Sequence, residues 1–354
     1  MTLTARDRVP VSLLTGFLGS GKTTLLRHLL EDPALARSAV VVNEYGDTDF
    51  NEVALARAAP EVVPVNAACF CCTGRAQLVE TLGTLGNRQG DSGFERVFLE
   101  TSGLSDPAPV LQALINDRAL VTRYRIDTVI TVCDAVTGLE NLAERPEARR
   151  QVVLADRVVI TKTDVAARRE IELLRARLRE LNPRAQILEA AQGKIEPEKL
   201  LLSLSGRQWH ETLPEESGEP AAHGHAESVH AWTLRRAQPV TEAGLALWMD
   251  LLAAYRGSEL LRMKGLIDVA GRPVLVESIR HVFHPPVRLG TWPGGARETR
   301  VVVIAQGIER AVVERDFDAL NFAPMRGPLD PQAYERFRRL MLRFGRTGRQ
   351  RAQR

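Results

Sequence analysis

The segment Gly16-Phe17-Leu18-Gly19-Ser20-Gly21-Lys22-Thr23-Thr24 has the spacing of a phosphate-binding P-loop, G-x-x-x-x-G-K-[ST]. The backbone N–H groups of such a loop surround a pyrophosphate, and glycine leaves room for this approach because it has no Cβ. Lys22 is spaced to reach the β- and γ-phosphates, and the Thr23 hydroxyl is spaced to bind Mg²⁺. The sequence therefore predicts that a nucleoside triphosphate binds at Gly16, Gly19, Ser20, Gly21, Lys22, Thr23 and Thr24.

A second motif, Thr161-Lys162-Thr163-Asp164, directly follows the apolar run 158–160 and fits the position at which GTPases recognise guanine. The carboxylate of Asp164 can accept hydrogen bonds from N1 and N2 of guanine, whereas adenine presents an acceptor at N1. The aliphatic part of Lys162 can cover the base. Thr161 stands where asparagine is usual, so it keeps a hydroxyl but lacks the amide. These residues predict GTP as the nucleotide.

Acidic residues that follow two other apolar runs are candidates for the catalytic and magnesium-binding groups. In Glu100-Thr101-Ser102-Gly103 the acid is placed to address Mg²⁺, and the glycine is placed to sense the γ-phosphate. Glu44, in Asn43-Glu44-Tyr45-Gly46-Asp47, belongs to a candidate first switch. We therefore predict Lys22, Glu44, Glu100 and Gly103 as catalytic residues, and Thr23 and Glu100 as magnesium ligands.

Three of the four cysteines lie within Cys69-Phe70-Cys71-Cys72, where their thiols can supply soft ligands to one tetrahedral ion such as Zn²⁺. Without a second, distant pair of ligands this is an incomplete and accessible site, suited to taking up and releasing a metal. Cys133 stands alone and is predicted to be a buried apolar side chain. His223, His225 and His230 form a weak, accessory metal site or, equally well on composition, part of a solvated linker with no role.

These motifs lie within a pattern of short apolar runs that alternate with amphipathic segments. We predict strands at 9–14, 39–42, 61–65, 96–99, 128–132, 157–160 and 186–188, and helices at 22–30, 75–85, 107–116 and 165–181. Such alternation predicts an α/β fold, a P-loop domain with a mostly parallel sheet that is covered on both faces. The carboxyl ends of the parallel strands should bring the candidate residues, and Asp134 after the strand 128–132, into one crevice.

The pattern changes after residue 208. Residues 209–229 have linker composition, with many acids, histidines and two prolines. Strands are then predicted at 230–235, 265–269, 273–281 and 299–305, and helices at 241–255, 308–317 and 331–344. We therefore predict a P-loop domain at 1–208, a linker at 209–229 and a smaller α+β C-terminal domain at 230–354.

Composition excludes several classes of protein. The 354 residues are 44% hydrophobic and 26% charged, which is ordinary for a globular protein. A net charge of +3 gives no argument for nucleic acid, and no apolar run reaches the roughly 18 residues needed to span a bilayer. No cleavage site follows the first apolar run, and clustered thiols without an export signal predict a cytoplasmic protein.

The order of the motifs, GxLGxGKTT, NE[FY]G, CxCC, ExxG and KxD, resembles that of the CobW-like GTPases, a group of metallochaperones. Arg262-Met263-Lys264-Gly265 and the segment 280–286 look like the C-terminal domain of that family. The resemblance implies that GTP and Mg²⁺ bind, and that zinc, cobalt or iron is carried to client metalloenzymes. It assigns metal binding to Cys69, Cys71 and Cys72, and guanine recognition to Lys162 and Asp164.

Three residues depart from the family pattern: Ala68 replaces a glycine, Thr161 an asparagine, and Asn51 a frequent acid. The leading hypothesis is a GTP-dependent zinc chaperone whose client metalloprotein docks on the C-terminal domain. The alternative is a nucleotide-dependent switch of partner assembly in which the cysteines sense redox state. A small-molecule phosphotransferase is a third and less favoured hypothesis, because the sequence shows no motif for a second substrate pocket. The oligomeric state stays open.

Overall fold

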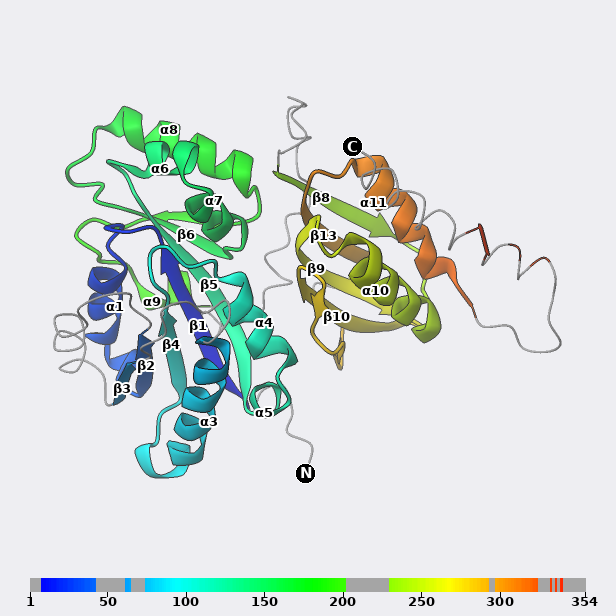
Figure 1. The fold of residues 1–354 in the computed structure, drawn as a ribbon, viewed down its shortest axis with the longest axis horizontal. Helices are drawn as coiled ribbons and strands as arrows, with labels where there is room; N and C mark the ends of the chain where they lie inside the picture. Colours follow the sequence, from blue (N-terminus) through cyan, green and yellow to red (C-terminus); the bar gives the residue numbers. More distant parts are fainter. Residues whose placement is uncertain are drawn as a thin grey trace. The chain divides into compact units, whose positions relative to one another are not determined.

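The computed structural model of the protein describes residues 8–42, 61–64, 74–201, 229–292 and 297–323, with residues 332, 335, 338 and 339 of the C-terminal segment. The chain divides into two compact units, Met1–Glu215 and Glu216–Arg354 (Figure 1). The predicted linker lies outside the described residues except for Val229, so its boundaries stay a prediction.

The first unit is built on a parallel sheet of seven strands in the order β3-β2-β4-β1-β5-β6-β7 (Figure 1). β1, β2, β4 and β6 are buried almost throughout, as expected for a parallel sheet with helices on both faces. The strands are β1 (Val9–Gly16), β2 (Ser38–Val42), β3 (Glu61–Pro64), β4 (Arg96–Glu100), β5 (Tyr124–Asp134), β6 (Arg157–Thr161) and β7 (Gln186–Glu189).

Alternate residues of these strands face two separate hydrophobic clusters. Val159 of β6 packs with the helices α1 and α9 on one face of the sheet, and its neighbours Val158 and Ile160 pack with α6, α7 and α8 on the other. The helices are α1 (Lys22–Leu30), α3 (Gly74–Ser92), α4 (Ala108–Asn116), α5 (Arg118–Val121), α6 (Gly138–Glu144), α7 (Pro146–Val153), α8 (Arg168–Leu181) and α9 (Pro197–Leu200). A 3₁₀ turn spans Pro33–Leu35.

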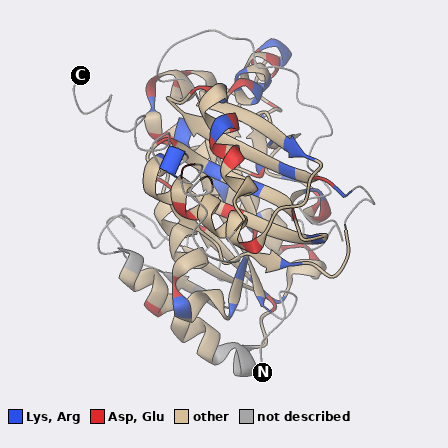
Figure 2. Cartoon of the chain, turned by 90° about the vertical axis from the view of Figure 1, so that its right-hand side faces the viewer, with Lys and Arg blue, Asp and Glu red and all other residues tan. Residues whose placement is uncertain are grey.

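The second unit contains an antiparallel sheet in the order β11-β10-β9-β13-β8, with β12 paired to β10. Residues of α10 and α11 share its hydrophobic cluster, in which Trp248 contacts the edge of Phe317. Basic and acidic residues are interspersed over this unit (Figure 2), and Arg262 and Lys264 both pair with Glu277. Its elements are β8 (Val229–Arg236), α10 (Glu242–Arg256), β9 (Leu260–Val269), β10 (Arg272–Ile279), β11 (Val282–Phe283), β12 (Val287–Arg288), β13 (Thr299–Gln306), α11 (Arg310–Phe317) and a 3₁₀ turn at Asp318–Asn321.

Both predicted fold classes, the α/β P-loop domain and the α+β C-terminal domain, are confirmed. One strand end was predicted too late, because β10 stops at Ile279 and Arg280 turns the chain with a φ of 54°. The predicted helix at 331–344 lies mostly outside the described residues. Over the described part of the chain, no helix is long and apolar enough to cross a membrane.

Candidate functional site

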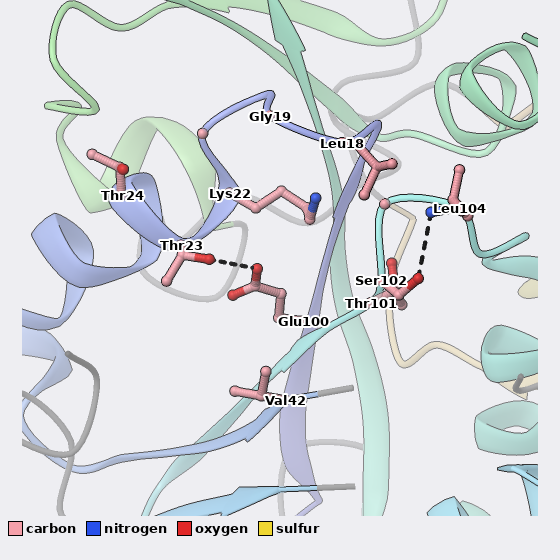
Figure 3. Close-up of a pocket in the computed structure, with 12 residues that line it drawn as sticks. Leu18, Gly19, Lys22, Thr23, Thr24, Val42, Glu100, Thr101, Ser102 and Leu104 are labelled. Carbon is pink, nitrogen blue, oxygen red and sulfur yellow. Dashed lines mark hydrogen bonds between the residues drawn. The ribbon is translucent and has the colours of Figure 1, made fainter. Parts of the chain in front are cut away.

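The predicted P-loop connects β1 to α1 and borders a cavity of about 510 Å³ at the carboxyl ends of the strands (Figure 3). A cavity of this size is within the range of small-ligand sites. The loop and the segment that follows β4 form its walls. The lining residues are Leu18, Gly19, Gly21, Lys22, Thr23, Thr24, Val42, Glu100, Thr101, Ser102, Gly103 and Leu104.

Gly16 is required by the packing of the sheet and does not line this cavity. A Cβ at Gly16 would lie 2.3 Å from the carbonyl oxygen of Val132 on the neighbouring strand β5, and 2.9 Å from Oγ of Ser20. Its φ of +146° lies in the region that favours glycine. The packing against β5 therefore requires glycine here, which is a reason that the sequence pattern did not reveal; the role of Gly16 in phosphate binding stays a prediction.

Three predicted groups meet at the centre of the cavity. The Thr23 hydroxyl donates to Oε1 of Glu100 at 2.9 Å, and Glu100 is almost fully buried. Nζ of Lys22 donates to the carbonyl oxygens of Gly16 at 2.9 Å and of Phe17 at 3.3 Å, so it lies along the loop (Figure 3). A hydroxyl beside a buried carboxylate is the hard oxygen donor set that suits Mg²⁺, and the adjacent lysine suits phosphate.

The loop after β4 is pressed against the P-loop at Gly103. A Cβ on Gly103 would lie 2.7 Å from both the backbone nitrogen and Cδ2 of Leu18, so only glycine fits in this arrangement. At the start of the loop, the Thr101 hydroxyl donates to Oγ1 of Thr15 at 2.8 Å. The predicted phosphate-sensing glycine is thus in direct contact with the predicted phosphate-binding loop.

Thr161 joins the end of β6 to the P-loop. Its hydroxyl, buried with the rest of the residue, donates to the carbonyl oxygen of Ser20 at 2.6 Å, and the carbonyl oxygen of Cys133 lies 3.3 Å away. Threonine at this position therefore ties the candidate base site to the candidate phosphate site without an amide side chain.

Lys162 is held by a residue that the sequence had marked only as a strand end. Its Nζ lies 2.5 Å from Oδ2 of Asp134, a buried residue at the end of β5. Oδ1 of Asp134 accepts from the backbone nitrogens of Val136 and Thr137 at 2.6 and 3.1 Å. Burial acts to raise the pKa of Asp134, but the hydrogen bonds from Lys162 and the two backbone groups outweigh it and lower the pKa. The carboxylate is therefore charged and fixes the lysine.

Asp164 is exposed and meets a turn that sequence reasoning missed. The backbone nitrogen of Gln192 donates to Oδ1 of Asp164 at 3.4 Å, in a turn closed by a bridge between Ala191 and Lys194. Gly193 of this turn lies against the side chain of Thr24. The turn follows β7, so the candidate base site has a wall from a third strand end. The only signal in the sequence was the glycine of this turn, Gly193.

The remaining candidates divide into two groups. Cys133 is buried as predicted, and burial, with a smaller effect of the Asp134 charge, raises the pKa of its thiol to about 12. His230 is the second residue of β8 in the other unit, where its ring stacks on Trp232. The other predicted residues, Glu44, Cys69, Cys71, Cys72, His223 and His225, lie outside the described residues, as do Asn51 and Ala68.

The parallel sheet, the loop between β1 and α1 and the cavity at the strand ends define a P-loop nucleotide-binding protein. Two family models match the chain: the CobW/HypB/UreG nucleotide-binding domain over residues 10–189, and the cobalamin synthesis protein cobW C-terminal domain over residues 229–321. The chain therefore belongs to the CobW/HypB/UreG family, with the C-terminal domain of the CobW branch.

Individual relatives cover most of the chain. It is similar to the zinc chaperone YjiA of Escherichia coli, at 32% identity over 282 residues, which covers 78% of this chain and 87% of that protein. It is also similar to the zinc chaperone CobW of Pseudomonas aeruginosa, at 29% identity over 346 residues, covering 86% and 90%. The crystal structure of Zn(II)-bound YjiA GTPase from E. coli superposes with a TM-score of 0.63 at 25% identity, over 89% of this chain and 99% of that one.

Proposed function

We propose that the protein is a GTP-hydrolysing metal chaperone that binds zinc and transfers it to client metalloproteins. The observation that carries this proposal is the meeting of Lys22, Thr23 and Glu100 in one cavity whose P-loop is joined, through Thr161, to the guanine-type motif. Relatives named zinc chaperones, and a Zn(II)-bound GTPase of similar fold, support the metal part of the proposal.

The proposed roles follow from the chemistry of the side chains. Lys22 binds the β- and γ-phosphates and stabilises negative charge as the terminal phosphate leaves. Thr23 and Glu100 hold Mg²⁺, which when bound neutralises charge on the phosphate oxygens. Gly103 offers its backbone N–H to the γ-phosphate, and Glu44 orients the attacking water. Lys162 covers the guanine base and Asp164 accepts its hydrogen bonds.

Zinc is the cargo, and we assign it to the thiolates of Cys69, Cys71 and Cys72, since thiolates select Zn²⁺ or Co²⁺ over Mg²⁺. Ordering of the nucleotide-binding loops by GTP would draw these thiols into tetrahedral geometry and raise their metal affinity. By linkage, the metal then favours the GTP-bound state by the same factor. Hydrolysis releases the ion to a client docked on the C-terminal domain.

A calorimetric titration tests the proposal. Zn²⁺, Co²⁺ and Fe²⁺ are added to the reduced protein without nucleotide, with GDP and with a non-hydrolysable GTP analogue. We expect stoichiometric, tight Zn²⁺ binding that depends on the GTP analogue. The variant with serine at Cys69, Cys71 and Cys72 should lose it, because a serine hydroxyl does not deprotonate near neutral pH as a zinc-bound thiol does.

The matched control removes His223 and His225, which should change the affinity much less, because the proposal assigns tight zinc binding to the three thiolates. If the serine variant still responds fully to Zn²⁺ and the histidine variant does not, the metal site is in the linker. Reversible disulfide or sulfenic acid formation without metal binding would instead support the redox-sensing switch.

A further inference from the structure

Gln151 of α7 binds the loop that contains the proposed phosphate sensor. Its side chain is completely buried, and its Nε2 donates to the carbonyl oxygens of Gly103 at 3.0 Å and of Ser105 at 3.1 Å. Both hydrogens of the amide group therefore donate to carbonyl oxygens of the same short loop. No sequence motif had marked this residue.

The helix that carries Gln151 is itself anchored on the far side of the contact. The Thr131 hydroxyl of β5 donates to the backbone oxygen of Gln151 at 2.7 Å. Nδ2 of Asn182, a buried residue at the end of α8, lies 2.8 Å from the carbonyl oxygen of Val152 and 3.0 Å from that of Ala155. The end of α7 is thus fixed to β5 and α8, so Gln151 presents its amide to the loop from a rigid support.

The oxygen of the same amide group makes no stabilising hydrogen bond within the described residues. Oε1 of Gln151 is buried and has no hydrogen-bond partner within the described part of the chain. A buried acceptor without a donor destabilises a protein, and an apolar side chain of similar length would avoid that penalty. Such exceptions to polar satisfaction are expected where a residue serves function.

The contact with Gly103 fixes the orientation of one peptide plane. Because the peptide is planar and trans, the N–H of Leu104 points away from the carbonyl oxygen that Gln151 binds. That nitrogen is 3.4 Å from Oγ of Ser102, at the margin of a hydrogen bond, and all three residues line the cavity (Figure 3). The opposite side of Gly103 is pressed against Leu18, as described above. The loop is therefore held between α7 and the P-loop.

We propose that Gln151 is a positioning residue that holds the loop 103–105 in the geometry that senses the γ-phosphate of GTP. This inference rests on the proposed GTPase function. It implies that Gln151 affects the hydrolysis of GTP, because the loop contacts its terminal phosphate. Gln151 should hardly affect the binding of GDP, which lacks that phosphate. A residue with a merely structural role would affect the binding of both nucleotides alike.

The test compares Gln151→Met, which removes both donors at similar length, with wild type and with Thr131→Val. Thr131→Val removes the hydroxyl that anchors the backbone of Gln151 but leaves both donors to the loop, so it should slow hydrolysis less than Gln151→Met does. For Gln151→Met we expect single-turnover GTP hydrolysis about 10- to 100-fold slower, because misplacement of a reacting contact by about 1 Å has effects of this size. GDP affinity should stay within about twofold of wild type, since GDP lacks the phosphate that the loop contacts and therefore does not respond to the position of the loop.

Gln151→Glu provides a second variant of the same shape, whose carboxyl group has no donor when charged and only one when protonated, so it cannot bind both carbonyls and should also hydrolyse GTP more slowly than wild type. The inference is overturned if Gln151→Met hydrolyses GTP at the wild-type rate, or if it loses affinity for GDP and a GTP analogue equally. Wild-type protein that neither binds nor hydrolyses GTP would refute the proposed function and this inference together.

Discussion

Thr161→Val should show how the base site is coupled to the phosphate site. Valine has nearly the shape of threonine, so the substitution removes one hydroxyl and leaves the packing in place. The lost donor is buried and lies 2.6 Å from the carbonyl oxygen of Ser20 in the P-loop. A buried carbonyl that loses its partner destabilises a protein by about 1–3 kcal/mol, so we expect the free energy of unfolding to fall by that amount.

The free energy of nucleotide binding should weaken by less than the free energy of unfolding does. The hydrogen bond is already present in the nucleotide-free protein, so binding is weakened only to the extent that the freed P-loop relaxes. If all of the 1–3 kcal/mol appeared in binding, the affinity would drop about 5- to 140-fold, which sets the upper limit. GDP and a GTP analogue should lose the same factor, because the bond to Ser20 does not involve the γ-phosphate sensor.

Chemical denaturation of the nucleotide-free protein and calorimetric titration with GDP measure the two effects separately. Thr161→Ser keeps the hydroxyl and serves as the control, so it should bind GDP as wild type does. The reasoning fails if Thr161→Val is as stable as Thr161→Ser and binds GDP with unchanged affinity.

Three further substitutions test other contacts of the site. Asp134→Asn should lower stability by about 1–3 kcal/mol at neutral pH, because Lys162 loses its carboxylate; since the folded pKa of Asp134 is lowered, denaturation curves should show this difference above about pH 4 and lose it as the pH falls further. Gly103→Ala should slow GTP hydrolysis by at least about tenfold in a phosphate-release assay, since the added Cβ would collide with Leu18. Asp164→Asn should shift preference from GTP toward xanthosine triphosphate in a competition assay, and an unchanged preference for GTP would mean that the base is recognised elsewhere.

Most of the first sheet was predictable because its strands are short, apolar and followed by helices. The helix 22–30 was predicted with its observed ends, since glycines precede it and leucines mark one face. β5 was predicted only from residue 128, although it begins at Tyr124. The missed residues 124–127 include Asp127, which accepts hydrogen bonds from Arg96 at 3.0 Å and Ser12 at 3.3 Å. Polar residues paired inside a sheet break the apolar pattern on which the prediction depended.

The end of α3 was missed for a related reason. The prediction stopped at residue 85, and the residues that follow, Gly86 and Asn87, are poor helix formers. In the structure the helix continues, and residues distant in sequence hold it: the Tyr124 hydroxyl donates to the carbonyl oxygen of Leu82 at 2.7 Å, and Arg123 donates to Oδ1 of Asn87. Tertiary contacts here override local propensity, and no single-sequence pattern reveals them.

The site shows the same division. The motif residues that are proposed to touch the ligand were predicted from the sequence, because their chemistry demands particular residue types at fixed spacing. Gln151 was not, since no helix was predicted over α7, and one glutamine outside any motif is indistinguishable from a solvated one until the fold brings it to Gly103. Asp134 was visible as a strand end, but its partner Lys162 lies 28 residues away and only the sheet register joins them.

The carboxyl half of β5 explains why these supports converge. Thr131 anchors the helix that carries Gln151, and Asp134 fixes Lys162. Between them, Cys133 places its carbonyl oxygen beside the Thr161 hydroxyl, and its thiol, with a pKa raised to about 12, stays protonated and unreactive at neutral pH. Neighbouring residues of one buried strand thus support both the proposed phosphate sensor and the proposed base site. The candidates for thiol chemistry in this protein are therefore the cysteines of the cluster that begins at Cys69, and not Cys133.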